Sequence, residues 1–159
     1  MKKHHKYYLS IGSNIQPEIN IPKTIELLRE YGNIQIISNA WESHDVGTSG
    51  PNFLNASALF STPLNPKELK NTIIRSIEAT LGRVRSSDKN APRTIDIDII
   101  MVDDEPCNLD RWKNPFVVIP MSEVAPELNH PIEHQKLSSV AERMSSQTWI
   151  KKRPEILNQ

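Results

Sequence analysis

The stretch NPKELKNTIIRSIEATLG, from Asn65 to Gly82, says most about the fold. Asn65 is a favourable N-cap residue, Pro66 suits a first helical turn, and Glu68 stands at the capping-box position three residues after the cap. Apolar side chains then recur every four residues, at Leu69, Ile73, Ile77 and Leu81. This spacing predicts a helix with one apolar face, and Gly82 is a typical residue to end it.

Strand-like segments flank this helix on both sides. Residues 53–60 read FLNASALF, and their alternation places Phe53, Asn55, Ser57 and Leu59 on one face of a strand. Residues 94–102 read TIDIDIIMV and are rich in β-branched side chains, so they predict another strand.

The N-terminal part also contains strand-like segments and a helix-like segment. Residues 7–11 and 34–43 are rich in strand formers, and residues 20–31 carry an apolar helical stripe with Asn20 as the expected N-cap and Gly32 as the expected terminator. The order β-α-β-β-α-β predicts an α+β, ferredoxin-like fold, in which helices pack on one face of a four-stranded sheet. After Pro106 the signals weaken, and residues 137–144 predict an additional C-terminal helical segment of a single domain over residues 1–159.

Composition excludes several classes of function. The 159 residues hold 19 basic and 19 acidic side chains, so the formal net charge is zero and no positive field favours nucleic acid or an anionic membrane. The five glycines form neither a dinucleotide-binding nor a Walker motif, and no apolar run is long enough to span a membrane. One cysteine fits a reducing cytoplasm. The small size, with no apolar helix face left over, favours a monomer.

Asp96 and Asp98 form an acidic pair on the strand predicted for residues 94–102. Their Cα atoms are expected roughly 6.5 Å apart on one face, so both carboxylates can reach the same cations. Carboxylates at this reach suit Mg²⁺, which takes the rest of its shell from water and substrate phosphates. Four basic residues precede the pair, which favours a site for metal and polyphosphate: Arg83, Arg85, Lys89 and Arg93. An exposed acidic strand face with surface ion pairs remains the alternative reading of the same residues.

Residues 89–100, KNAPRTIDIDII, resemble the signature of the 6-hydroxymethyl-7,8-dihydropterin pyrophosphokinase family. Weaker matches occur in family order at Gly12-Ser13-Asn14, Phe53-Leu54-Asn55-Ala56, Glu78 with Gly82-Arg83-Val84-Arg85, Phe116-Val117-Val118 with Pro120, and Glu123-Val124-Ala125-Pro126-Glu127. The resemblance covers residues 7 to about 130.

The resemblance implies transfer of the two terminal phosphates of ATP to the hydroxymethyl group of the dihydropterin, with release of AMP. It assigns two Mg²⁺ ions to Asp96 and Asp98, and a catalytic role to these acids together with Arg83 and Arg93. The residues implied for ATP binding are Glu78, Arg83, Arg85, Arg93, Ile99 and Arg111. The residues implied for pterin binding are Ser43, Val46, Phe53, Asn55 and Phe116.

One segment departs from the family pattern. Residues 107–115, CNLDRWKNP, are shorter than the family's segment and lack its phosphate-binding His and Arg, for which Arg111 or Lys113 could substitute by charge. Three hypotheses therefore stay open in descending order: an active pyrophosphokinase, a weakened relative that binds a pterin or Mg-ATP without efficient transfer or acts on another pterin, and a nucleic-acid-binding domain. The partners expected are small molecules only, with no nucleic acid and no membrane.

Overall fold

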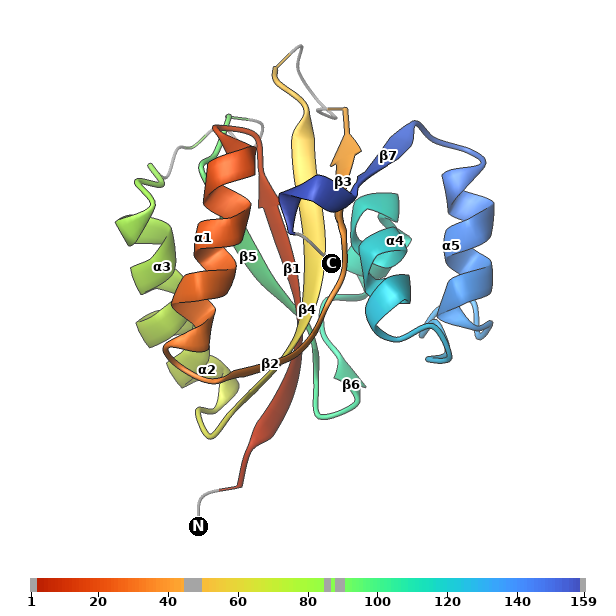
Figure 1. Cartoon of the computed structure of the whole chain (residues 1–159). Coiled ribbons are helices and arrows are strands. Elements are labelled where there is room, and N and C mark those ends of the chain that lie inside the picture. Colours follow the sequence, from red (N-terminus) through yellow and green to blue (C-terminus); the bar gives the residue numbers. More distant parts are fainter. Residues whose placement is uncertain (1–2, 45–49, 85–86, 88–90, 158–159) are drawn as a thin grey trace.

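The computed structural model describes residues 3–44, 50–84, 87 and 91–157. An antiparallel sheet forms its centre. Its strands lie in the order β6-β5-β1-β4-β3-β7, and β2 also pairs with β4 (Figure 1). The strands are β1 (His5–Ser13), β2 (Asn33–Ile37), β3 (Ala40–Ser43), β4 (Phe53–Thr62), β5 (Asp96–Val102), β6 (Glu105–Pro106) and β7 (Ile150–Arg153). The order of β5, β1, β4 and the β2–β3 pair confirms the predicted ferredoxin-like arrangement.

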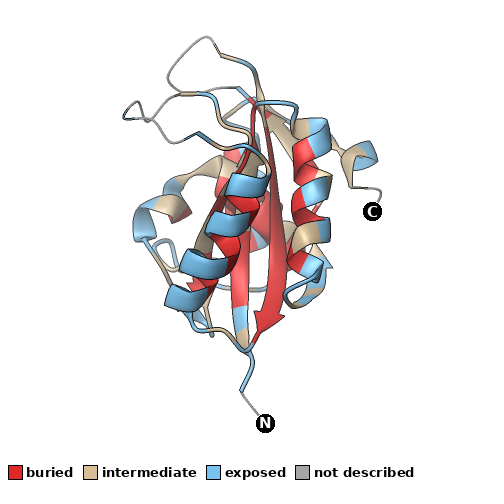
Figure 2. Ribbon diagram, turned by 90° about the vertical axis from the view of Figure 1, so that its left-hand side faces the viewer, coloured by how far each residue is buried: buried red, intermediate tan, exposed pale blue. Residues whose placement is uncertain are grey.

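Helices cover both faces of this sheet, where the sequence predicted one. One layer consists of α1 (Pro17–Arg29), α2 (Pro66–Glu68), the π-helical η1 (Leu69–Ile74) and α3 (Arg75–Thr80). The other consists of α4 (Pro115–Val124) and α5 (Leu137–Ser145), and short 3-10 turns form η2 (Leu109–Lys113) and η3 (Pro154–Ile156). The central strands are therefore buried along most of their length (Figure 2), with one apolar cluster beneath each helical layer.

The helix predicted for residues 65–82 is present but not regular. Asn65 and Glu68 form the predicted capping box, and Gly82 follows the helix at φ 80°. Between them, η1 inserts a π-helical segment, so that both Ile73 and Ile74 are buried where the four-residue repeat predicted Ile73 alone. Hydrogen bonds in a π segment span five residues instead of four, which shifts the apolar face in a way that the four-residue repeat does not reveal.

Two details of the N-terminal half differ from the sequence prediction. Helix α1 begins at Pro17 after Gln16, so Asn20 is not its N-cap; Asn20 lies inside the helix and donates from Nδ2 to the carbonyl of Ile15 at 2.6 Å. The helix ends at Arg29, before Gly32. Gly32 instead permits close approach to β4, because a Cβ there would lie 2.6 Å from both the Phe60 ring and the Ser61 carbonyl oxygen.

Glu123 ties α4 to the bend between β2 and β3. Its carboxylate accepts hydrogen bonds from the Asn39 backbone N–H and from Asn39 Nδ2, both at 3.0 Å, and from Trp41 Nε1 at 2.9 Å. Burial raises the pKa of Glu123, but these hydrogen bonds outweigh it and hold the pKa below the usual value. Because the folded-state pKa is depressed, the ionised group stabilises the fold above the unfolded pKa, and this contribution is lost as the pH falls through the folded pKa.

We therefore expect Glu123→Gln to lower the free energy of unfolding by about 1–2 kcal/mol at pH 7. The difference from the unsubstituted protein should shrink on acidification below about pH 4. Urea unfolding at both pH values measures it. Glu127→Gln is the matched control, since Glu127 is exposed and contacts only Lys136 among the ion pairs of the described residues. An equal loss in the control, or a difference that grows in acid, would contradict this assignment.

Candidate active site

Asp96 and Asp98 project from β5 onto the face of the sheet that carries α4. Asp96 lies opposite Gly12 of β1 and Asp98 opposite Ser10, and all four residues line one pocket of about 530 Å³. The strand alternation that the sequence showed therefore places both carboxylates toward the same space.

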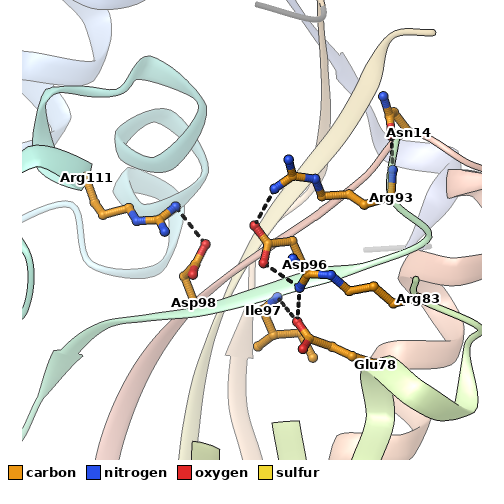
Figure 3. Close-up of polar contacts among 8 residues, drawn as sticks. All are labelled: Asn14, Glu78, Arg83, Arg93, Asp96, Ile97, Asp98 and Arg111. Carbon is orange, nitrogen blue, oxygen red and sulfur yellow. Dashed lines mark hydrogen bonds and ion pairs between the residues drawn. The ribbon is translucent and has the colours of Figure 1, made fainter. Parts of the chain in front are cut away.

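Two arginines hold Asp96, one from just after α3 and one from the loop before β5. Arg83 Nη1 lies 2.9 Å from one carboxylate oxygen and Arg93 Nη1 lies 3.2 Å from the other (Figure 3). Arg83 also pairs with Glu78 at 2.5 Å, and Glu78, which is only 3% exposed, accepts the backbone N–H of Ile97. The ion pairs Glu78–Arg83 and Arg83–Asp96 thereby join the end of α3 to β5.

Asn14 fixes the loop that leads into β5. Its Oδ1 accepts the backbone N–H of Arg93 at 2.8 Å, and its own N–H donates to the Arg93 carbonyl at 3.1 Å. Asn14 itself is 2% exposed, at the end of β1. This paired contact sets the position from which the Arg93 guanidinium reaches Asp96 (Figure 3).

Asp98 pairs with an arginine from the opposite side of the pocket. Arg111 Nη1, in η2, lies 2.8 Å from Asp98 Oδ2 (Figure 3). Burial raises the pKa of Asp98 to about 6, the negative charge of Asp96 adds to this, and Arg111 opposes it. A buried carboxylate whose pKa is raised by a neighbouring negative charge in this way is a favourable site for a cation.

The donor set fits a hard divalent cation shared with phosphate. Among the described residues, no group of three or more His, Cys, Asp or Glu side chains could hold a metal ion by itself. Asp96 and Asp98 would therefore supply carboxylate oxygens, and the remaining ligands would come from water and from a bound polyphosphate. This is how Mg²⁺ is commonly bound in nucleotide-dependent enzymes.

The same pocket contains the predicted aromatic slot. Phe53, Asn55 and Phe116 line it together with both acids, Arg93 and Arg111. Asn55 is held in place because its Nδ2 donates to Ser43 Oγ at 2.9 Å, and Ser43 is fully buried. Phe116 stands in the first turn of α4, where its N–H donates to the Asn114 side chain at 2.9 Å.

A second pocket, of about 680 Å³, follows the outer edge of β5. It lies between this strand, the η1 helix and the β6–η2 segment, and it shares Asp98 and Arg111 with the first pocket. Ile99, predicted to contact ATP, lines it, as do Ile74, Lys67, Lys70 and Cys107. The two pockets thus meet at the Asp98–Arg111 pair.

The predicted site residues divide into three groups. Phe53, Asn55, Arg93, Asp96, Asp98, Ile99, Arg111 and Phe116 line the two pockets. Ser43, Glu78 and Arg83 instead support residues that do. Arg85 and Val46 lie outside the described residues, together with Lys89 of the motif.

Sequence reasoning did not find several lining residues. Asn114 and Thr148 line the first pocket, and Lys67, Lys70, Ile74 and Cys107 line the second. The asparagine before Pro115 was a detectable N-cap signal. Thr148 comes from the segment after α5, where no sequence pattern pointed to the site.

Residues 8–126 match the sequence model of the family described as 7,8-dihydro-6-hydroxymethylpterin-pyrophosphokinase. The chain belongs to this family. It is 37% identical over 140 residues to the 2-amino-4-hydroxy-6-hydroxymethyldihydropteridine pyrophosphokinase of Aquifex aeolicus, covering 82% of this chain and 86% of that protein. It is also 34% identical over 137 residues to a folic acid synthesis protein of Dictyostelium discoideum, covering 80% of this chain and 20% of that longer protein.

The fold of this pyrophosphokinase relative is shared with a solved structure. The crystal structure of Plasmodium falciparum HPPK-DHPS with SDX-DHP superposes at a TM-score of 0.68 with 12% sequence identity, covering 92% of this chain and 45% of that one. Within the described ranges, no helix of this pyrophosphokinase family member has the length and apolar character needed to cross a membrane.

Proposed function

We propose that this protein transfers pyrophosphate from ATP to the hydroxymethyl group of 6-hydroxymethyl-7,8-dihydropterin and releases AMP, as a step of folate biosynthesis. The observation that carries the proposal is the junction of the two pockets. An aromatic slot with an oriented amide opens onto paired acids and arginines, and a second pocket for a nucleotide meets it at Asp98 and Arg111. Membership of the pyrophosphokinase family supports the same reaction.

The pterin is assigned to the first pocket. Phe53 and Phe116 offer flat apolar surfaces for stacking against a planar ring. The Asn55 Nδ2 donates to Ser43 Oγ at 2.9 Å and to the Trp41 carbonyl at 3.4 Å, so its Oδ1 is the atom proposed to accept a hydrogen bond from the edge of the pterin. Ser43 orients this amide from behind by accepting one of its protons. The hydroxymethyl group would then point toward the acids of β5.

ATP is assigned to the pocket along β5. Ile74 and Ile99 provide apolar surface for the base, and Lys67 and Lys70 add positive charge on one wall. The triphosphate would extend to Arg111 and Arg93, whose guanidinium groups bind phosphate oxygens in a forked geometry. The β-phosphorus then lies where the two pockets meet, so that the substrate hydroxyl forms its new bond there as the bond to AMP breaks.

Asp96 and Asp98 are proposed to hold two Mg²⁺ ions with the triphosphate. When bound, such ions would spread the negative charge on the bridging oxygens. Arg83 holds Asp96 in place and is itself held by Glu78. Arg93 and Arg111 supply positive charge to the phosphates as the negative charge of the phosphates redistributes during transfer. Positioning and electrostatics of this kind account for most of the catalysis in phosphoryl transfer.

We also propose that the chain forms a single domain and that the protein acts as a monomer in the cytoplasm.

The nucleotide product tests the proposed function. Incubation with ATP, Mg²⁺ and the hydroxymethyl dihydropterin should yield AMP in amounts equal to the pyrophosphorylated pterin, measured by ion-exchange chromatography. ADP as the product, or no turnover at high protein concentration, would reject it.

The ion pair between Arg111 and Asp98 also favours a second candidate. An arginine on a metal-binding carboxylate competes with the cation, so a relative that binds Mg-ATP or a pterin without efficient transfer is consistent with this contact. Tight binding of both ligands in calorimetry, with no AMP formed, would identify this second function.

Cys107 offers a test of where the nucleotide lies, because it lines the second pocket and is the chain's one cysteine. Burial raises the pKa of its thiol, so labelling with a bulky iodoacetamide dye is best done at about pH 8.5. We expect Mg-ATP at about ten times its Kd to slow labelling by about tenfold, and the pterin alone to leave the rate unchanged. Cys107→Ser controls for labelling elsewhere. Labelling that Mg-ATP does not slow would place the nucleotide outside this pocket.

A further inference from the structure

His130 is a buried histidine in the loop between α4 and α5, outside both pockets of the candidate site. It is 1% exposed, and its Nδ1 lies 3.1 Å from the backbone N of Ile132 and 3.2 Å from that of Glu133. Since both neighbours are N–H donors, Nδ1 is an acceptor and carries no proton. The ring proton of His130 is therefore on Nε2.

This proton is donated to the chain segment that carries Arg111. Nε2 of His130 lies 2.6 Å from the carbonyl oxygen of Trp112, the residue after Arg111 in η2. The Trp112 side chain is fully buried and meets the His130 ring edge-on, with centroids 5.7 Å apart. Its indole N–H has no hydrogen-bond partner among the described residues. The polar contact that anchors Trp112 to the loop after α4 is thus the bond from His130.

The η2 turn needs such an anchor to aim Arg111. It has five residues, and its own hydrogen bonds, from the N–H of Arg111 to the Asn108 carbonyl and from the N–H of Asn114 to the Arg111 carbonyl, are local. A short 3-10 turn of this kind fixes its own shape but not its orientation on the sheet. Besides the junction with α4 at Asn114, packing of Trp112 and the bond from His130 hold that orientation, and Arg111 reaches Asp98 at 2.8 Å.

We infer that His130 is a positioning residue for Arg111: it clamps the Trp112 carbonyl and so holds the Arg111 guanidinium at the junction of the two pockets. The inference rests on the proposed function, in which Arg111 binds the triphosphate. It also explains how a short segment that departs from the family pattern can still place an arginine beside the acidic pair.

Two substitutions distinguish the acceptor role of Nδ1 from the donor role of Nε2. His130→Asn keeps an acceptor near the Nδ1 position for the N–H groups of Ile132 and Glu133, but it lacks the donor to Trp112. His130→Gln places an amide donor near the Nε2 position. We expect His130→Asn to lower kcat/KM for Mg-ATP by about tenfold, mainly through KM, and His130→Gln to stay within about twofold of the unsubstituted protein. His134→Asn, at an exposed histidine of the same loop, is the matched control and should change nothing.

A double-mutant cycle with Arg111→Ala distinguishes positioning from general stability. If His130 acts through Arg111, His130→Asn should cost less than about twofold in the Arg111→Ala background. An equal tenfold loss in both backgrounds, or no loss with Arg111 present, overturns the inference. Should His130→Asn not fold, a tenfold loss in folded His130→Gln overturns it, and activity within twofold supports it.

Failure of the proposed function is recognised separately. Turnover by the unsubstituted protein is measured first, and its absence contradicts the proposed function alone. The same cycle is then measured as the Kd of a non-hydrolysable ATP analogue with Mg²⁺ in titration calorimetry. The same fold-changes and the same non-additivity are expected, and additive effects would again overturn the role of His130.

Discussion

Asp98→Ala should lower the rate of AMP formation by at least about a thousandfold, because it removes one of the two carboxylates proposed to hold the divalent ions. The fold should remain as stable or become more stable. Burial and the charge of Asp96 raise the pKa of Asp98 to about 6, so ionising this side chain at neutral pH costs more free energy in the folded than in the unfolded protein. Initial rates and thermal unfolding, measured on the same preparation, test both expectations.

Asp110→Ala is the matched control for this substitution. Asp110 is a strongly exposed aspartate in η2 that pairs with Lys113, so its loss should change neither activity nor stability. A large fall in melting temperature for Asp98→Ala would show that Asp98 is structural. Nearly full activity would show that the metal site lies elsewhere.

Arg111→Ala should lower the transfer rate by about a thousandfold or more, the range found for arginines that stabilise charge in phosphoryl transfer. Arg111→Lys should recover only part of this loss, because an ammonium group cannot bind two phosphate oxygens in a fork. Lys113→Ala is the matched control, since Lys113 lies in the same turn but points to Asp110. Rates are measured with saturating pterin and varied Mg-ATP.

A small effect of Arg111→Ala would also be informative. A loss of only a few fold would mean that the 107–115 segment contributes little to transfer and that Arg111 serves mainly as the partner of Asp98. It would remove the argument that this arginine replaces the phosphate-binding residues of the family pattern.

The sequence revealed those parts of the fold that local chemistry determines. The capping box at Asn65 and Glu68 and the glycine at residue 82 were readable because each depends on residues within one turn. Helix α5 confirms the helix predicted for residues 137–144, but α4 was not predicted. Helix α4 is apolar on most sides because it is buried between the sheet and α5, so it shows little of the alternation that marks a surface helix.

The candidate site shows the same limit. The acids on β5 could be placed on one face because a strand alternates strictly, and the pocket confirms that they share a space. The position of Arg111 could not be predicted, because it depends on a short turn anchored through Trp112 by His130, 18 residues later in the chain. Spacing along the sequence carries no signal for a contact made through a backbone carbonyl.

The proposal that Asp96 and Asp98 clamp a triphosphate through divalent ions is tested most directly by a crystal structure with Mn²⁺ and a non-hydrolysable ATP analogue. Anomalous scattering locates the Mn²⁺ ions independently of the surrounding water. We predict ions bound to both carboxylates, with the phosphates of the analogue on the same ions and Arg111 directed at the phosphates. An occupied nucleotide pocket without ions at these carboxylates, or side chains of Asp96 and Asp98 directed into bulk solvent, would contradict the account.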